Sequence, residues 1–199
     1  MVLDSEKGWP YSWNTIQDLP KDVFVNCEVD RVWQTVRGDP TALFSPHGVT
    51  DFKPERRVLI GTPGIGKSMA AGLCFLYQLL HCDVEKLQVA AHCFGGGEAC
   101  VFEKAIQTVT KYVDEKQCIM AVRSLGQRGT KGYIIYDVAT KETQPEQFFF
   151  LLSYAWGMIV MSFPKLSNCD EWERQMKAER IIMNCPEEKD VKAMCVDNA

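Results

Sequence analysis

The sequence lacks the patterns that mark secreted, zinc-binding and strongly basic proteins. Its N-terminus has no basic segment followed by an apolar stretch, so no secretory signal is visible. Its nine cysteines form no Cys-x-x-Cys pair, and its three histidines do not stand at zinc-ligand spacing. We therefore interpret the cysteines as reduced thiols of a nuclear or cytoplasmic protein. A formal net charge of −4 gives no sign of a nucleic-acid-binding face within these residues.

One stretch requires a test for membrane insertion. Residues 147–164 carry no charge and are long enough to span a bilayer. Gly157 divides the stretch, however, and buried strands of parallel sheets are themselves almost continuous apolar runs. A buried helix followed by a buried central strand explains this composition better, so we expect no membrane partner.

The strongest positive signal is the segment from Gly61 to Ser68, which reads GTPGIGKS. It matches the phosphate-loop pattern of glycine, four residues, then Gly-Lys-Ser. Glycines let the backbone curl so that successive amides point at a phosphate, and the following helix adds its own amides and dipole. An apolar run at 58–60 precedes the loop, and an apolar helical pattern over 69–82 follows it. Strand, glycine loop and helix in this order are the context that confirms the motif.

Each position of this motif predicts a role in holding a nucleotide. Lys67 would reach the β- and γ-phosphates, and the Ser68 hydroxyl would coordinate Mg²⁺. The cofactors that the motif predicts are therefore ATP or GTP together with Mg²⁺. The residues predicted to contact the nucleotide are Gly61, Thr62, Pro63, Gly64, Ile65, Gly66, Lys67, Ser68 and Met69.

A second signal is the apolar run 133–136, which ends in Asp137. A buried strand of this kind delivers a carboxylate to its C-terminal edge, where Asp137 could hold Mg²⁺ directly or through a water shared with Ser68. Asp137 could equally begin a turn. We predict Lys67 and Asp137 as the catalytic residues, and Ser68 and Asp137 as the metal ligands.

The remaining pattern predicts an α/β fold. We expect a P-loop NTPase-like three-layer sandwich: a mainly parallel five-stranded sheet with helices on both faces and a small β-hairpin insertion. Residues 1–55 read as an irregular covering segment with a short helix at 29–36, and residues 56–199 as the core. The expected strands are 58–60, 87–94, 133–137, 158–162 and 181–184, with the hairpin at 100–104 and 108–113. The expected later helices lie around 119–125 and at 143–156, 170–180 and 186–195.

Several long stretches resemble the retrotransposon hot spot protein family. They are RVLIGTPGIGKSMAAG (57–72), YQLLH (77–81), KGYIIYDVAT (131–140) and AERIIMNCPEEKDVKAMC (178–195). The resemblance runs from about residue 50 to the end. It implies a P-loop NTPase domain with an ATP/GTP-binding motif, in a protein found in the nucleus, around it or in the cytoplasm, whose gene is an insertion site for retroelements. Position by position it covers Gly61, Gly64, Gly66, Lys67 and Ser68 as phosphate-binding, and also Asp137. Because members are usually much longer, we expect a copy truncated at its C-terminus.

Turnover is a separate question from binding. Many such NTPases have a water-orienting glutamate directly after the strand-end aspartate, whereas this sequence has Val138. Glu98 and Glu142 are alternative candidates for that role. Ser162, at the end of another strand, could sense the γ-phosphate or cap the turn before Pro164. The candidate arginine fingers, supplied by this or another subunit, are Arg123, Arg128 and Arg180.

Three functions therefore remain open. The first is an NTPase domain acting as a motor or switch in nuclear or nucleic-acid-associated processes, by self-association or within a larger complex. The second is a nucleotide-binding regulatory module, or a degenerate fragment, without turnover. The third is a small-molecule kinase, which ranks last because residues 108–128 supply no basic lid.

Overall fold

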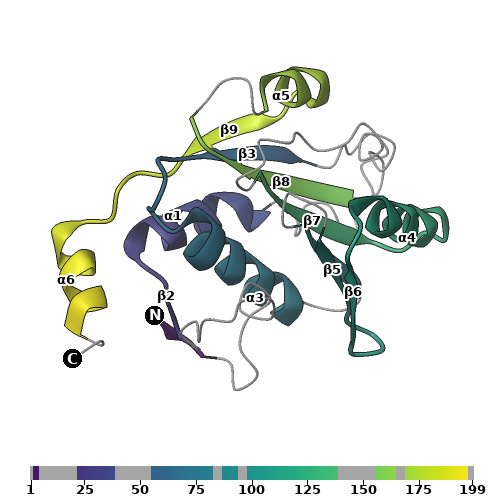
Figure 1. Cartoon of the computed structure of the whole chain (residues 1–199), viewed down its shortest axis with the longest axis horizontal. Helices are drawn as coiled ribbons and strands as arrows, with labels where there is room; N and C mark the ends of the chain where they lie inside the picture. Colours follow the sequence, from purple (N-terminus) through teal and green to yellow (C-terminus); the bar gives the residue numbers. More distant parts are fainter. Residues whose placement is uncertain are drawn as a thin grey trace.

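A seven-stranded mixed β-sheet forms the centre of the computed structural model (Figure 1). The structure describes residues 2–4, 22–38, 55–82, 87–93, 98–138, 156–164 and 169–196. Across the sheet the strands follow the order β6-β5-β4-β7-β8-β3-β9. Their bounds are β3 Arg56–Ile60, β4 Val89–Cys93, β5 Ala99–Glu103, β6 Thr108–Tyr112, β7 Gly132–Asp137, β8 Trp156–Ser162 and β9 Glu179–Ile182. A separate two-stranded sheet pairs β1 (Val2–Leu3) with β2 (Val23–Phe24).

The sheet is mixed and has more strands than expected. Neighbouring strands from β4 through β7, β8 and β3 to β9 pair in parallel, whereas β5 and β6 pair antiparallel to their neighbours. The prediction of a mainly parallel five-stranded sheet with an inserted hairpin is therefore wrong in strand number. The hairpin exists, but β5 pairs with β4 along all five residues, so the hairpin extends the sheet to seven strands. The C-terminal ends of β3, β7 and β8 meet at one edge, because these strands are parallel.

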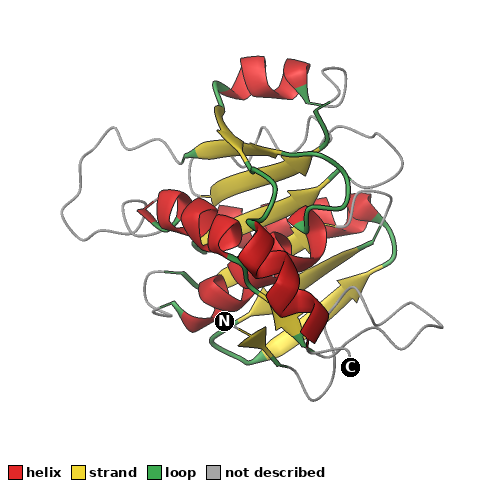
Figure 2. Ribbon diagram, turned by 90° about the vertical axis from the view of Figure 1, so that its left-hand side faces the viewer, coloured by secondary structure: helices red, strands yellow, loops and turns green. Residues whose placement is uncertain are grey.

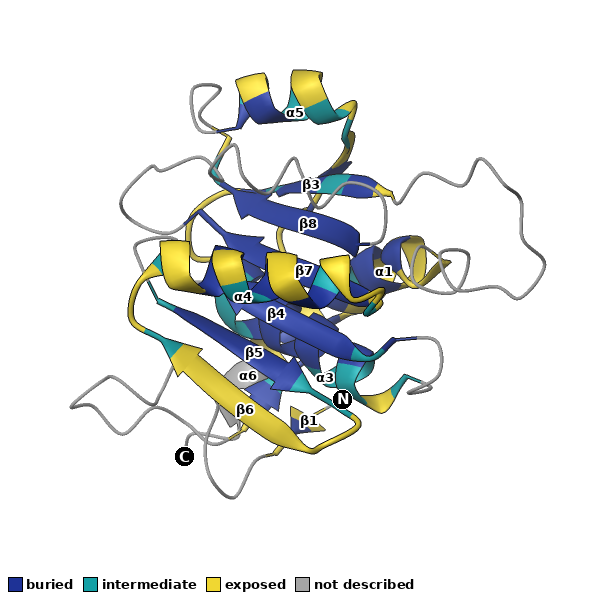
Figure 3. Cartoon of the chain, turned by 90° about the vertical axis from the view of Figure 1, so that its right-hand side faces the viewer, coloured by how far each residue is buried: buried dark blue, intermediate teal, exposed yellow. Residues whose placement is uncertain are grey.

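Helices cover both faces of this sheet, as expected (Figures 1 and 2). One face packs against α1 (Cys27–Val36), η2 (Lys67–Gly72) and α3 (Leu73–His81). The opposite face packs against α4 (Glu115–Gln127) and α5 (Asp170–Met176), and Figure 3 shows α4 crossing in front of the buried strands. Two apolar cores therefore lie on the two sides of one sheet.

Helix α1 confirms the short helix expected over residues 29–36. Asn26 precedes it in an extended conformation, and its side-chain oxygen accepts a hydrogen bond from the Val29 amide at 2.9 Å. This N-cap satisfies one of the amides that have no partner inside the helix. The Trp33 and Phe75 rings, whose centroids are 6.0 Å apart, pack α1 against α3. The buried face of α1 consists of Val29, Val32, Trp33 and Val36.

Strand β8 begins earlier than the sequence pattern predicted. We expected a helix to end at Trp156 and the strand to begin at residue 158, but Trp156 and Gly157 both belong to β8. The physical reason lies in the neighbouring strand β7, where Gly132 pairs with Trp156. A Cβ atom at Gly132 would lie 2.4–2.5 Å from three atoms of the Trp156 ring, so the glycine makes room for a buried indole. The rest of the helix expected at 143–156 lies outside the described residues.

The boundary between α5 and β9 also differs from expectation. We predicted a helix from Asp170 to Arg180, whereas α5 ends at Met176 and Arg180 belongs to β9. Lys177 adopts a left-handed conformation (φ 52°), which turns the chain out of the helix. The last helix, α6 (Glu188–Val196), lies apart from the sheet (Figure 1). No helix in the described part of the chain is both long and apolar enough to cross a bilayer.

Candidate functional site

The glycine loop joins β3 to η2 at the C-terminal edge of the sheet. Gly64 and Gly66 adopt left-handed conformations, with φ of 82° and 91°, which strain residues that carry a Cβ atom. Between them the chain turns sharply, and Gly66 then caps η2. Both required conformations therefore fall on glycines of the predicted motif.

The helix after the loop starts with an unusually wide turn. The amides of Ala70 and Ala71 both donate to the Gly66 carbonyl oxygen, at 2.8 and 2.9 Å. The second of these bonds spans five residues, which makes the first turn of η2 π-helical. Such turns are frequent at functional sites. The amides of Lys67, Ser68 and Met69 precede the first intrahelical donors.

Gly61 allows the loop to pack closely against the segment that follows β9. A Cβ atom there would lie 2.4 Å from Cδ1 of Ile65, 3.1 Å from the Met183 carbonyl oxygen and 3.3 Å from the Met183 Cβ. Met183 is itself fixed, because its amide donates to the Ile60 carbonyl oxygen at 2.8 Å. The first glycine of the motif therefore serves close approach, whereas Gly64 and Gly66 serve backbone conformation.

Lys67 is turned inward and is almost completely buried, with 6% of its surface exposed. Its ammonium donates hydrogen bonds to the carbonyl oxygens of Gly61 (2.5 Å) and Thr62 (2.7 Å). The ammonium also lies 4.7 Å from the ring centroid of Phe163. Burial lowers the pKa of the Lys67 ammonium, and the Asp137 carboxylate opposes this shift. Lys67 and Asp137 therefore interact electrostatically at the same edge of the sheet.

Asp137 is the last residue of β7 and is buried. It pairs with Met161 of β8, and β8 in turn pairs with β3, whose Ile60 lies beside Ser162. One strand therefore separates Asp137 from the start of the loop, which corresponds to about 10 Å between the two strand axes. The sheet order brings the predicted aspartate to the predicted loop, although the two are about seventy residues apart in sequence.

Two family models match the chain. The model described as "Retrotransposon hot spot protein, P-loop domain" matches residues 58–198, and the model described as "Retrotransposon hot spot proteins N-terminal" matches residues 1–55. The chain belongs to the retrotransposon hot spot protein family. The resemblance noted in the sequence is thus confirmed, and the glycine loop, Lys67 and Asp137 all lie within the P-loop domain of the family. No match was found among the curated proteins.

The oxygen atoms available in this P-loop domain suit a magnesium ion. Mg²⁺ prefers hard oxygen ligands, and it is usually held by one or two carboxylates together with phosphate oxygens and water. Asp137 supplies a buried carboxylate, and the half-buried Ser68 supplies a hydroxyl in the first turn of η2. Within the described ranges no group of three or more His, Cys, Asp or Glu side chains could hold a metal. The donor set thus fits an ion whose other ligands come from a phosphate and from water.

The structure does not place a carboxylate for orienting the attacking water as clearly as it places Lys67 and Asp137. Val138, after Asp137, is buried and carries no carboxylate. Glu98 forms an ion pair with Lys111 across the β5–β6 hairpin, at 3.5 Å. Glu142 lies outside the described residues. The Ser162 hydroxyl donates locally to the Phe163 carbonyl oxygen at 3.2 Å, which favours the turn-capping alternative over the γ-phosphate sensor.

Two of the candidate arginine fingers lie on α4, which covers the sheet face opposite η2, whereas Arg180 lines a pocket beside the start of the loop. Arg123 is on the exposed side of α4 and Arg128 is at its C-terminal end. Arg180 donates to Glu173 at 2.5 Å and to Asp170 at 3.4 Å, so two carboxylates of α5 hold its guanidinium. Arg180 is therefore beside the loop but is held by α5, and the geometry assigns none of the three to the phosphates of its own chain.

Phe163 and the adjoining pocket were not predicted from the sequence. A pocket of about 260 Å³ borders the beginning of the loop at Gly61 and Thr62, and Phe163 is one of its walls. The sequence signal that could have drawn attention to Phe163 is its position directly after the predicted strand end, Ser162, at the edge where Asp137 also ends its strand. Its contact with Lys67 depends on which strands are neighbours, and no local pattern reveals that.

Proposed function

We propose that this chain binds a nucleoside triphosphate, ATP or GTP, as its Mg²⁺ complex at the glycine loop. The observation that carries the proposal is the juxtaposition of Lys67, at the start of η2, with the buried Asp137 carboxylate two strands away. A cation beside amides suits phosphate oxygens, and a carboxylate at the same edge suits the accompanying metal ion. The proposed sites are Gly61–Met69 for the nucleotide and Ser68 with Asp137 for Mg²⁺.

The backbone supports phosphate binding independently of Lys67. Left-handed residues between right-handed ones form concave "nests" of amides that attract anions, and Gly64 and Gly66 supply such residues. The amides at the start of η2 add the positive end of a helix dipole. Lys67 would then leave the carbonyl oxygens of Gly61 and Thr62 and contact the β- and γ-phosphates.

Binding without rapid turnover is the second candidate function. It is favoured by the apolar Val138 beside Asp137 and by the engagement of Glu98 with Lys111. Hydrolysis would need a water-orienting group and an arginine, which a second copy or a larger complex could supply. We propose NTPase activity for a complex in which another subunit supplies these two groups, in a nuclear or cytoplasmic protein. The eight cysteines in the described residues are free thiols, which supports a reducing compartment.

The kinase alternative has the least support. A kinase lid would have to bring basic side chains over the phosphates, and residues 108–128 are the segment in which such a lid is expected. In the sheet order, β6 is the edge strand farthest from β3 on that side, with four strands between them. Helix α4 packs on the face opposite η2. This segment therefore lies far from the loop.

The test is a titration with a fluorescent ATP analogue in the presence of Mg²⁺, followed by an assay of phosphate release. We expect a dissociation constant on the order of micromolar, which Lys67→Ala and removal of Mg²⁺ with EDTA both weaken at least tenfold. Lys116→Ala is the matched control, because Lys116 is exposed on α4. Equal binding by wild type and Lys67→Ala would refute the site.

Phosphate release separates the remaining functions. Release well above that of Ser68→Ala supports NTPase activity, and release no higher than that control supports the regulatory module. Release that depends on an added small acceptor would instead support a kinase.

A further inference from the structure

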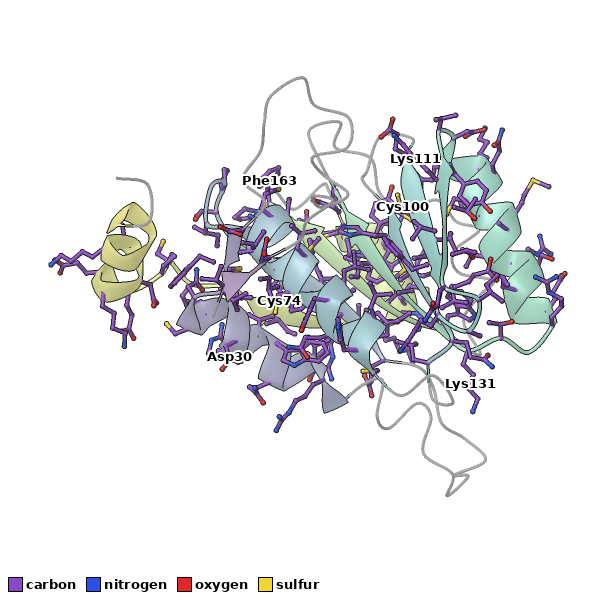
Figure 4. All side chains as sticks on the ribbon, turned by 90° about the horizontal axis from the view of Figure 1, so that it is seen from below. Asp30, Cys74, Cys100, Lys111, Lys131 and Phe163 are labelled. Atoms are coloured by element: carbon purple, nitrogen blue, oxygen red, sulfur yellow. The ribbon has the colours of Figure 1, made fainter. Side chains whose placement is uncertain are left out.

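Phe163 lies directly after the C-terminal end of β8, the strand beside β3. It follows Ser162, the last residue of β8, and β8 lies between β3, which leads into the loop, and β7, which ends at Asp137. From this position the Phe163 ring lies 4.7 Å from the Lys67 ammonium (Phe163 is labelled in Figure 4). The face of an aromatic ring carries partial negative charge and attracts a cation at this distance. Phe163 is thus a direct partner of the motif lysine.

Lys67 is held by two kinds of contact at once. Two carbonyl oxygens of its own loop accept hydrogen bonds from the ammonium, and the Phe163 ring attracts the same group. Because Lys67 is 6% exposed, water competes little with these contacts. Asp137 is the anionic side chain whose charge acts on the ammonium. A phosphate that recruits Lys67 must therefore compensate for the loss of both the carbonyl and the ring contacts.

The pocket beside the loop provides space for the ring to move. Phe163 is one of its walls, and the others include the apolar side chains of Ile60, Pro164 and Met183. With a volume of about 260 Å³, the pocket offers apolar surroundings to a phenyl ring that turns away from Lys67. The ring can thus leave the cation and still contact apolar side chains.

We propose that Phe163 is a positioning residue for Lys67. Its ring holds the ammonium beside the carbonyl oxygens of the loop and releases it when a nucleoside triphosphate binds, so the ring lowers the affinity for the nucleotide. This inference rests on the proposed function and adds a residue to it. It predicts that a weaker attraction between ring and cation strengthens nucleotide binding.

The first experiment replaces Phe163 with phenylalanines that carry one, two and three ring fluorines. Fluorine withdraws charge from the ring face and changes the ring shape little, so this series separates the cation–π contact from packing. We expect the affinity for Mg·ATP to rise stepwise, by up to about fivefold. Phe163→Leu should bind about as tightly as the trifluoro variant. Binding that does not change across the series would overturn the proposal.

A second readout reports on the nucleotide-free protein. In protein labelled with ¹³C at the lysine ε-carbons, the Lys67 signal is assigned by its loss in Lys67→Arg. We expect the Phe163 ring current to shift this signal away from those of exposed lysines. Both Phe163→Leu and Mg·ATP should abolish the shift. If the Lys67 chemical shift is the same in Phe163→Leu as in the wild type, the contact between Phe163 and Lys67 is overturned. If the protein does not bind Mg·ATP at all, both the proposed function and this role of Phe163 are overturned. If it binds Mg·ATP with an affinity that does not change across the fluorine series, only the role of Phe163 is overturned.

Discussion

The substitution Gly61→Ala tests how the loop is packed onto the sheet. The added methyl group would lie 2.4 Å from Cδ1 of Ile65 and 3.1 Å from the Met183 carbonyl oxygen. Ile65 is half-buried and packs against the core, so its Cδ1 cannot move away without losing packing, and Met183 is held by its backbone hydrogen bond to Ile60. Overpacking of this kind costs about 1–3 kcal/mol, so we expect the free energy of unfolding to fall by about 2 kcal/mol.

A second substitution tests whether Cδ1 of Ile65 causes this loss of stability. Ile65→Val removes Cδ1 and with it the closest contact, leaving only the milder approach to Met183. In the Ile65→Val background, Gly61→Ala should therefore cost less than about 1 kcal/mol, which gives a coupling energy of about 1 kcal/mol. The assay is urea unfolding followed by tryptophan fluorescence. Gly38→Ala is the control, because no atom lies within 4 Å of the position of its added Cβ. Additive effects of Gly61→Ala and Ile65→Val would refute the account of the loop packing.

Two further substitutions test the sheet. Gly132→Ala should lower the free energy of unfolding by about 3 kcal/mol, because the new methyl group meets three atoms of the buried Trp156 ring; a loss below about 1 kcal/mol in urea unfolding would contradict the close contact. Burial lowers the pKa of His92 from 6.5 to about 3. Below pH 6.5 the His92 side chain is therefore protonated in the unfolded chain but stays neutral in the folded state. Stability should therefore fall by about 2 kcal/mol from pH 7 to pH 5 through this group alone. His92→Gln should lose that part of the pH dependence in urea unfolding, and equal slopes for the two proteins would contradict it.

Local patterns predicted most of the elements that surround the site. The runs at 58–60, 133–137 and 158–162 became β3, β7 and β8, because residues buried on both faces of a sheet must be apolar throughout. The motif also located the two left-handed glycines, Gly64 and Gly66, since few other residues tolerate that conformation.

The errors have non-local causes. Nothing within residues 99–112 indicates that β5 pairs with β4 and widens the sheet to seven strands. Trp156 belongs to a strand because Gly132, which is 24 residues earlier, leaves room for its ring. The contact between Phe163 and Lys67 likewise depends on the order β8-β3 in the sheet. Residues that meet only through sheet order leave no periodic signal in the chain.

The most direct test of nucleotide binding is an amide chemical-shift titration of ¹⁵N-labelled protein with the Mg²⁺ complex of a non-hydrolysable ATP analogue. We expect the largest shifts on the amides from Gly64 to Met69, saturating with a single dissociation constant, and a further shift at Asp137 at the end of β7. Saturable shifts confined to other parts of the chain, with the amides of Gly66, Lys67 and Ser68 unmoved, would contradict this expectation.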